Sequence, residues 1–378
     1  MQSLNDLDMF PTTYDSIVER INNINPIKYA KTRNFINGDV TYLSPYLSRG
    51  VISVQQIKES VLQKGFKPYE IEKFLQELAW REYYQRVWQV KKELIFSDLK
   101  QPQPDSIHDQ MPAAVVNAST GIESIDAYIN TFYKTGYLHN HIRMYLASIV
   151  CNNAKAHWLA PSTWMYYHLL DGDLASNSCS WQWVAGSFSS KKYYCNQENI
   201  NKYTFTNQQD TFLDYSYEHI ATMTVPKALE ATSSLSFVTN LPQTAVPKLD
   251  TTKQTLLYNS YNLDPLWRAN EHVNRVVMLE PSHFNKYPVS DNVIQFIMAL
   301  SKNISGIEVY AGEVDALVRQ YENGDLTFSN AFISKEHPAF EYYPGIKDSR
   351  EWMFPNTEGY YPSFFSFWKK GTSAKGKI

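Results

Sequence analysis

The chain has 378 residues, of which 43% are hydrophobic and 19% charged, so it can bury a large core in one or two domains. Its net charge of −3 excludes the strongly basic composition typical of nucleic-acid-binding proteins. No apolar run is long enough to span a bilayer, and the N-terminus lacks the pattern of a signal peptide. Three widely spaced cysteines argue against a disulfide framework, so we expect a cytoplasmic protein without a membrane partner.

Helical spacing dominates the first part of the chain. Residues 44–65 predict helix starts at Ser44-Pro45 and at Ser53. Residues 70–90 place apolar side chains on one face between charges, which predicts another helix. Residues 122–158 predict two helices that are separated at Thr135–Gly136. The first domain is therefore expected to be helical, over residues 1–205.

The pattern changes in the second half of the chain. Residues 206–253 are rich in Ser, Thr, Ala and Pro and predict an irregular connector. Residues 254–378 follow as a small α/β region, and its order of strand, helix and strand predicts a parallel βαβ unit. Its strands are expected at 255–260, 275–281 and 307–313, with a helix at 289–304. The aromatic tail, residues 351–370, is expected to pack on the body before a disordered end rich in Lys and Gly.

The segment Leu169–Gly186, LLDGDLASNSCSWQWVAG, concentrates the chemically informative residues. Asp171 and Asp173 could bind a divalent ion, but the regularly spaced oxygen ligands of a calcium loop do not follow them. A capped turn with solvated acids is the simpler interpretation. The surrounding apolar sequence nevertheless requires cations or hydrogen-bond donors as partners for these acids.

Nearby helices offer such partners. Arg143 can pair with Asp171 or Asp173, whereas Glu77 and Arg81 have the i, i+4 spacing of an ordinary helical ion pair. The indoles of Trp181 and Trp183 are two residues apart on a helix and are expected to occupy two different environments. Gly-rich phosphate loops, the His-Glu-x-x-His zinc motif and the Gly-x-Ser-x-Gly elbow are all missing from the sequence. The residues alone therefore predict a buried pocket for a flat, polar heteroaromatic ligand, with no metal.

Six segments in order resemble the FAD-binding domain of the photolyase/cryptochrome family, over about residues 29–203. They are TYLSPYLSRGVIS, FLQELAWREYY, TGYLHNHIRMYLAS, HW, LLDGDLASN and WQWVAG. The resemblance implies a mainly α fold, a helical FAD-binding domain followed by the smaller α/β region, with FAD as the cofactor. The strands after the connector resemble part of the α/β domain that normally precedes this module in the family.

The resemblance also implies roles for individual residues. Asn177 matches the residue that faces flavin N5, and an amide there adds no negative charge near a reduced flavin. Trp181 and Trp158 match the proximal and middle members of a photoreducing tryptophan chain, and the distal tryptophan is not found. The positions that match cofactor contacts are Tyr29, Thr41, Tyr42, Leu43, Ser44, Phe74, Asn140, Arg143, Asp171, Gly172, Asp173 and Asn177.

A second set of positions matches the pocket that cradles a cyclobutane pyrimidine dimer. Its carboxylic group, Glu77, would hydrogen-bond the thymine edge, while two indoles clamp the extruded bases. His141 stands where the family usually has an arginine that touches DNA. The positions that match substrate or DNA contacts are Glu77, Trp80, Arg81, Asn140, His141, Met144 and Trp183.

The resemblance therefore predicts a deoxyribodipyrimidine photolyase-like lyase that uses light and reduced FAD to repair pyrimidine dimers. A preference for single-stranded DNA is expected, because base extrusion costs least there and the chain carries little positive charge. The alternatives are a cryptochrome-like blue-light receptor without repair activity, or an interaction protein with a relict pocket. The sequence leaves the oligomeric state and the presence of an antenna pigment open.

Overall fold

The computed structural model describes residues 9–321 and 328–373. The chain forms two compact units, each built from separate parts of the sequence. Unit 1 comprises residues 1–24, 41–82 and 237–378, and unit 2 comprises residues 25–40 and 83–236. The helix α5 (Glu72–Lys91) begins in unit 1 and ends in unit 2.

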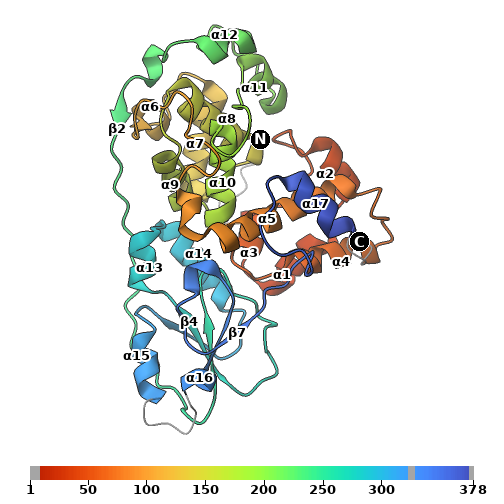
Figure 1. The fold of residues 1–378 in the computed structure, drawn as a ribbon, viewed down its shortest axis with the longest axis vertical. Helices are drawn as coiled ribbons and strands as arrows, with labels where there is room; N and C mark the ends of the chain where they lie inside the picture. The colour runs from red at the N-terminus through yellow and green to blue at the C-terminus, as the bar shows by residue number, and fades with distance from the viewer. Residues whose placement is uncertain (1–8, 322–327, 374–378) are drawn as a thin grey trace. The chain divides into compact units, whose positions relative to one another are not determined.

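Unit 2 is helical, and α10 packs against both α8 and α9 (Figure 1). The strands described in this unit are β1 and β2, which form an antiparallel pair of two residues each. Besides the second part of α5, its elements are α2 (Pro26–Thr32), η2 (Lys92–Phe96), β1 (Met111–Pro112), α6 (Ala113–Val116), α7 (Glu123–Thr135), α8 (Asn140–Ser148), η3 (Ile149–Asn153), α9 (Leu159–His168), α10 (Leu174–Ala185), α11 (Gln197–Thr204), α12 (Tyr217–Thr222), η4 (Lys227–Leu229) and β2 (Thr232–Ser233).

Local sequence signals set the ends of the central helices in unit 2. Gly136 takes a left-handed conformation, with φ 66°, and ends α7, so the predicted break at Thr135–Gly136 is confirmed. Gly186 ends α10 in the same way, with φ 86°. Asp173 caps the start of α10 by accepting a hydrogen bond from Ser176 N. The acidic turn, Asp171-Gly172-Asp173, is therefore fixed immediately before a buried helix.

The helical part of unit 1 consists of α1 (Tyr14–Asn22), α3 (Ser44–Ser48), α4 (Val54–Gln63) and the first part of α5. Ser53 caps α4 through Gln56 N, so both predicted helix starts in this region are confirmed.

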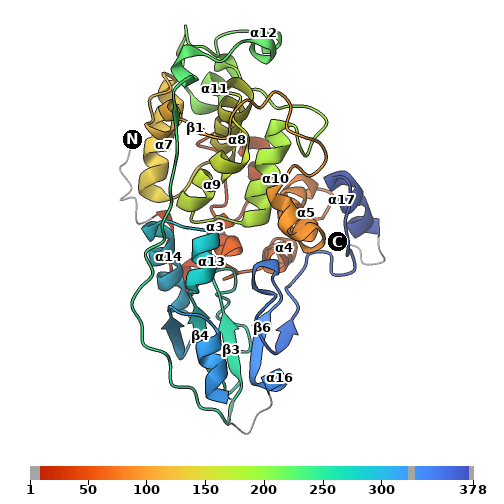
Figure 2. The ribbon, with the colours of Figure 1, turned by 60° about the vertical axis from the view of Figure 1, so that its left-hand side comes forward.

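A five-stranded, fully parallel sheet forms the remainder of unit 1, with the order β5-β4-β3-β6-β7 (Figure 2). All four residues of the central strand are buried, as parallel sheets require. The predicted βαβ unit is confirmed as β3, β4, α14 and β5, whereas β6 and β7 were not predicted. The elements are β3 (Thr255–Tyr258), β4 (Asn274–Met278), α13 (Pro281–Lys286), α14 (Asp291–Ser301), β5 (Ile307–Tyr310), α15 (Asp315–Val318), η5 (Arg319–Tyr321), α16 (Phe328–Ala331), β6 (Phe332–Lys335), η6 (Pro338–Phe340) and β7 (Ile346–Asp348).

An extended segment, residues 234–254, leads to this sheet without helix or strand structure. Hydrogen bonds hold it at successive points. Thr239 Oγ1 donates to Val289 O at 3.0 Å, Ala311 N donates to Thr244 Oγ1 at 2.8 Å, and Gln320 Nε2 donates to Pro247 O at 2.9 Å. The earlier part of the predicted connector, residues 206–233, contains α12, η4 and β2.

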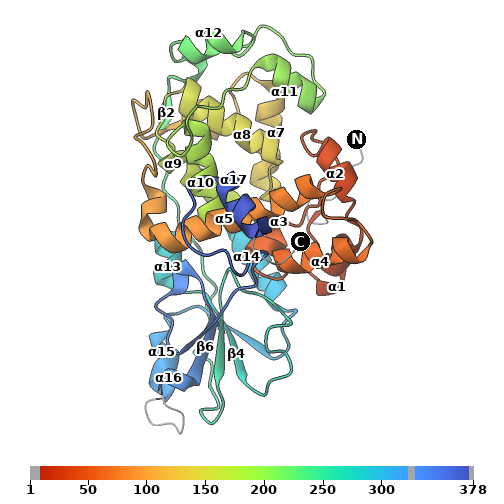
Figure 3. The ribbon, with the colours of Figure 1, turned by 45° about the vertical axis from the view of Figure 1, so that its right-hand side comes forward.

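The aromatic tail ends in α17 (Phe364–Ser373), which lies beside α5 (Figure 3). The prediction that this tail packs back on the body is confirmed, because Phe364, Phe367 and Trp368 are buried. Residues 374–378, where a disordered end was predicted, lie outside the described residues. The three cysteines are buried free thiols, and no helix within the described residues is long and apolar enough to cross a membrane.

Candidate functional site

The acidic turn of unit 2 connects α9 to α10. Its two carboxylates are almost completely inaccessible, since Asp171 is 7% and Asp173 3% exposed. Gly172 N donates to Leu169 O at 3.0 Å and closes the turn. Buried carboxylates must be partnered, and the structure supplies a different partner for each one. The solvated turn that the sequence left as the simpler interpretation is therefore not formed.

Arg143 is the partner of Asp171, as the sequence predicts. Its Nη2 lies 2.8 Å from one carboxylate oxygen and 3.0 Å from the other. The guanidinium is held by a second hydrogen bond, from Nε to Leu138 O at 2.9 Å, and lies over the ring of Tyr137. The Asp171 side chain is 3% exposed, so this pair is shielded from solvent on the acid side.

Asp173 has partners on two elements. One oxygen accepts from Ser176 N at 2.7 Å, and the other accepts from Gln85 Nε2 at 2.7 Å. Gln85 lies on α5 and is 3% exposed. It was not predicted, because a glutamine in a helix carries no signal of the turn that it contacts. Ser176 Oγ is buried and has no hydrogen-bond partner among the described residues.

Asn177 is fixed by a single side-chain contact in the part of the chain that the structure describes. Its Nδ2 donates to Ser162 O on α9 at 2.9 Å. Because the amide nitrogen is engaged, the carbonyl oxygen of this half-buried side chain remains an acceptor for a ligand.

The two indoles on α10 occupy different environments, as predicted. Trp181 is 2% exposed, whereas Trp183 is 38% exposed and has the ring of Tyr193 as a neighbour at 6.1 Å. Gln182, between them, is completely buried. Its Nε2 donates to Ile95 O, and its Oε1 accepts from Leu99 N. The glutamine thus fixes α10 to the segment after α5, and the sequence analysis missed it.

Trp158 is buried at the start of α9, where its Nε1 donates to Asp98 Oδ1 at 2.7 Å. The same carboxylate oxygen lies 3.5 Å from His157 Nε2. The sequence analysis also missed Asp98, which lies 60 residues from Trp158 along the chain.

Two predicted DNA-binding residues, Asn140 and His141, lie at the start of α8. Asn140 is exposed, and its Nδ2 lies 3.7 Å from Met144 Sδ, so these two predicted pocket residues are in contact. The ring of His141 packs against Tyr203 at 4.7 Å and Tyr145 at 5.4 Å. Burial, with a smaller contribution from Arg33, lowers the pKa of His141 to about 4. The imidazole is therefore neutral at pH 7.

Unit 1 contains the predicted cofactor segment Thr41 to Ser44. Tyr42 has φ 52°, a left-handed conformation that is unusual for a bulky residue, and Thr41 Oγ1 accepts from Leu43 N at 3.4 Å. This strained turn precedes the first residue of α3, Ser44, which is exposed.

The other predicted residues of unit 1 lie on the first part of α5. Phe74 is buried, whereas Glu77, Trp80 and Arg81 are half-buried. Glu77 forms an ion pair with Lys73 at 3.1 Å. Arg81 Nη2 donates to Leu47 O at 3.1 Å, which ties α5 to α3.

The ring of Trp80 is stacked on Phe364 of α17. The ring centroids are 3.9 Å apart, and the planes differ by 10°. Sequence analysis predicted that the tail packs on the body but gave no indication that its partner is a predicted pocket residue.

Tyr29 lies on α2 in unit 2. Its neighbour in the sequence, Lys28, lines an open hollow of about 620 Å³, whereas Tyr29 is not among the lining residues. The rings of Phe35 and Phe205 stack there with centroids 5.6 Å apart. The hollow is lined by Lys28, Thr32, Phe35, Asn37, Gly38, Asp39 and Phe205.

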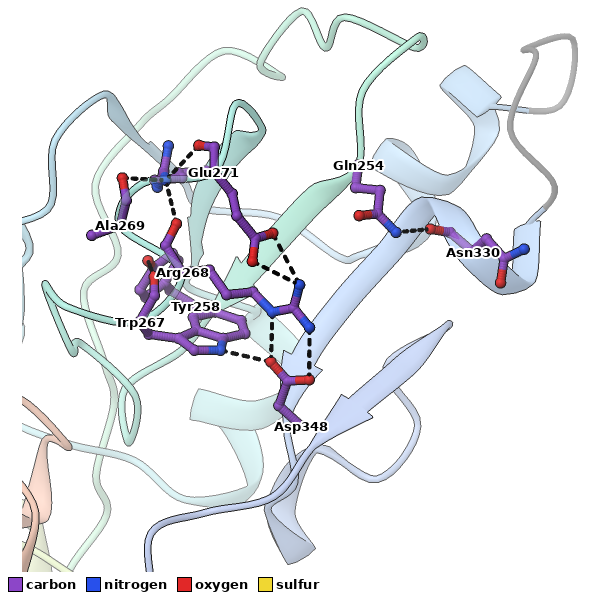
Figure 4. Close-up of polar contacts among 9 residues, drawn as sticks. Gln254, Tyr258, Trp267, Arg268, Ala269, Glu271, Asn330 and Asp348 are labelled. Carbon is purple, nitrogen blue, oxygen red and sulfur yellow. Dashed lines mark hydrogen bonds and ion pairs between the residues drawn. The ribbon is translucent and has the colours of Figure 1, made fainter.

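A second hollow, of about 420 Å³, lies in unit 1 at the carboxyl ends of β3, β6 and β7, where ligands often bind in parallel sheets. Four of the five charged residues in its lining form two ion pairs. Asp348 accepts from Arg268 at 2.7 and 3.0 Å and from Trp267 Nε1 at 2.8 Å, and Lys335 donates to Asp264 at 2.8 Å (Figure 4 shows the Asp348 cluster). Its lining is Asp264, Leu266, Trp267, Arg268, Lys335, Asp348, Ser349 and Glu351.

Residues 74–235 match the family model described as the FAD binding domain of DNA photolyase. Over these residues the chain is similar to the FAD-binding domain of photolyases. Its curated relatives include the deoxyribodipyrimidine photo-lyase of Streptomyces griseus, 31% identical over 163 residues, which are 42% of this chain and 35% of that one. That of Synechococcus sp. is 31% identical over 169 residues, again 42% of this chain and 35% of the relative. The chain spans about a third of the length of these two relatives.

Two solved structures are also similar to this chain. A cryptochrome from Synechocystis sp. is 23% identical, with a TM-score of 0.47, over 51% of this chain and 44% of that one. A bacterial class III photolyase from Agrobacterium tumefaciens is 24% identical, with a TM-score of 0.44, over 50% of this chain and 41% of that one.

FAD is the cofactor of the matched domain, and the acidic turn fits such a ligand. Ser176 Oγ is a buried donor without a partner among the described residues, and Asn177 keeps a free carbonyl oxygen beside it in sequence. A polar heterocycle that carries both donors and acceptors can satisfy both groups.

Proposed function

We propose that the protein is a photolyase that repairs cyclobutane pyrimidine dimers in DNA with light. The observation that carries this proposal is the buried acidic turn, with Arg143 and Gln85 as its fixed partners, inside the residues that match a photolyase FAD-binding domain. When bound, reduced FAD would supply an electron to the dimer on absorbing blue or near-ultraviolet light. The remaining steps rest on the chain's own side chains.

The acidic turn would hold and orient the cofactor. Asp171 and Asp173 are already fixed by Arg143, Gln85 and the first turn of α10, so little freedom is lost when a ligand binds. Asn177 would present a neutral amide to the redox edge. A carboxylate at this position would repel a reduced, anionic ring, whereas the amide does not.

The buried tryptophans Trp181 and Trp158 would pass electrons to the oxidised cofactor and so reduce it. Asp98 supports this role for Trp158, because a carboxylate 2.7 Å from the indole nitrogen stabilises positive charge that develops on the ring. The carboxylate can also accept the Nε1 proton. Its side chain is 23% exposed, so that proton has a path to solvent.

Glu77 and Trp183 are the groups that would meet the lesion. Trp183 is the more accessible indole of α10, and a flat exposed ring offers a stacking surface to an extruded base. Glu77 would hydrogen-bond the thymine edge and stabilise the negative charge that the electron brings.

A preference for single-stranded DNA is part of the proposal. His141 is neutral at pH 7 and adds no cation for a phosphate, which supports weak binding to an intact duplex. An already unpaired base also needs the least energy to be extruded.

The test is illumination of the reduced protein with an oligonucleotide that carries one thymine dimer. We expect light-dependent loss of the dimer, faster on single-stranded than on duplex substrate. Glu77→Ala should slow it at least about tenfold, the effect of losing a hydrogen bond to a charged group. Glu72→Ala, an exposed acid on the same helix, is the matched control and should have no effect. No loss of dimer in any sample would refute the proposal.

A second candidate is a cryptochrome-like light receptor without repair activity. The stack of Phe364 on Trp80 favours it, since a C-terminal segment in contact with a predicted pocket residue could transmit a signal. Flavin-loaded protein that responds to light but leaves the dimer intact would support the receptor over the photolyase.

A further inference from the structure

The C-terminal segment is attached to α5 by a buried carboxylate. Glu82 is 3% exposed and accepts hydrogen bonds from the backbone nitrogens of Met353, at 2.5 Å, and Phe354, at 3.1 Å. The two hydrogen bonds come from adjacent backbone nitrogens and hold this part of the tail against α5. The tail is therefore fixed at Met353 and Phe354, ten residues before α17 begins at Phe364.

The helix α17 then packs closely on this attachment point. Phe354 has Phe367 and Trp368 as edge-on ring neighbours, each at 5.7 Å. Gly371 approaches the same ring so closely that a Cβ there would lie 2.6 Å from it. These contacts make α17 an ordered element whose position is set independently of Phe364.

Phe364, the first residue of α17, extends this packing to Trp80. The separation of 3.9 Å and the angle of 10° describe two parallel rings in van der Waals contact. Aromatic pairs in proteins more often adopt offset or edge-to-face arrangements. Parallel stacking at this distance is the arrangement in which a nucleobase lies on an indole.

We propose that Phe364 occupies the base-stacking face of Trp80, so that the C-terminal segment and an extruded pyrimidine compete for one surface. This inference rests on the proposed function, which makes Trp80 a lesion contact. The segment then acts as an intramolecular inhibitor of DNA binding. Damaged DNA binds only when it displaces Phe364, while Glu82 and Phe354 retain the rest of the tail.

The test measures binding in the dark, without any need for repair. A labelled single-stranded oligonucleotide with one thymine dimer is titrated with the full chain and its variants. Phe364→Ala should tighten binding about three- to tenfold, the range expected for loss of one ring stack. Phe364→Leu keeps the buried apolar volume without the flat ring and should also tighten binding.

Phe365→Ala is the matched control. Phe365 follows on the same helix but is 67% exposed, so its removal should leave the affinity unchanged. Circular dichroism and thermal unfolding of each variant establish that α17 still packs. In the wild-type chain, amide hydrogen exchange at the start of α17, around Phe364, should accelerate when the dimer oligonucleotide is added.

The possible results separate the two proposals. Equal affinity of the wild-type, Phe364 and Phe365 variants, with unchanged exchange in α17, overturns the competition while repair can still be observed. Tighter binding by the Phe364 variants without any light-driven repair supports the competition and refutes the photolyase. If no variant binds the oligonucleotide at all, the competition is overturned as well.

Discussion

Each unit of the molecule contains an aspartate–arginine pair, and the two pairs differ in burial and geometry. In unit 2, one nitrogen of Arg143 serves both oxygens of Asp171, whose side chain is 3% exposed. In unit 1, Arg268 presents two nitrogens to Asp348, and both side chains are about a quarter exposed, at 28% and 24%. Among the described residues, the buried acid therefore depends on a single donor group, whereas the more exposed acid has water as a substitute.

We propose that the two pairs serve different functions through the same ion-pair chemistry. A buried pair gains little net stability over apolar residues of similar size, so its retention needs another reason. Ligand binding is such a reason, and the residues around Asp171 match a FAD-binding domain. The exposed pair joins Trp267 and Glu271 in a surface cluster that fixes the loops after β3 and β7.

Removal of the arginines is the strongest test of this comparison. Arg143→Ala leaves Asp171 buried without its partner and should lower the free energy of unfolding by about 3 kcal/mol. Arg268→Ala should lower it by less than about 1 kcal/mol, as for exposed pairs. Urea unfolding of the two variants measures both values. Similar losses would show that burial does not distinguish the pairs.

Asp173 separates the capping role of the acidic turn from its charge. Asp173→Ala removes the cap of α10 and should cost about 1–2 kcal/mol of unfolding free energy. Asp173→Asn retains the cap, so its stability should stay close to wild type. Flavin release on denaturation reports whether the charge matters for the cofactor. Full flavin retention in the alanine variant would exclude Asp173 from the cofactor site.

The pair of Arg268 and Asp348 should make the free energy of unfolding depend on pH. The Arg268 guanidinium beside Asp348 holds the pKa of that carboxyl below its usual value. A lowered folded-state pKa contributes stability above the unfolded value of about 4 and loses it as the pH falls through the folded value. Between pH 5 and pH 2, Asp348→Asn should therefore lose less stability than the wild type, as thermal unfolding at each pH would measure. Parallel curves would contradict this assignment.

His141 should also lower the free energy of unfolding as the pH falls, by a smaller amount than Asp348. Its folded-state pKa of about 4 lies below the unfolded value of about 6.5, so the unfolded chain binds more protons between these values. Stability is complete above about pH 6.5 and falls as the pH decreases toward 4. His141→Gln should flatten this part of the curve. An unchanged slope would mean that the ring is already charged in the folded protein.

The sequence predicted the elements whose signals are local. Ser53, Gly136 and the strand pattern around β3 to β5 identified helix ends and the parallel unit, because caps and apolar runs depend on a few adjacent residues. The strand β7 was not predicted, because it has only three residues, none of them buried, and its sequence resembles a loop.

The candidate site was predictable in part for the same reason. Arg143 and Asp171 combine opposite charges with apolar surroundings, so their pairing could be inferred. Gln85, Gln182 and Asp98 were missed because each contacts a partner tens of residues away in the chain. Their roles depend on tertiary packing, which a pattern within one helix does not contain.

The π-helix η3 follows α8 directly and changes the direction in which the side chains after it point. Ala154 N bonds to Ile149 O, five residues back, so this turn contains one residue more than an α-helical turn. Each residue turns a helix by about 100°, so a helical wheel drawn from Asn140 misplaces every side chain beyond the turn. The extra residue directs Asn152 to Val184 O and Tyr193 O, at 3.1 and 2.7 Å. Deletion of one residue from η3 would restore the phase and turn this amide away, which would remove the hydrogen bond between η3 and the end of α10.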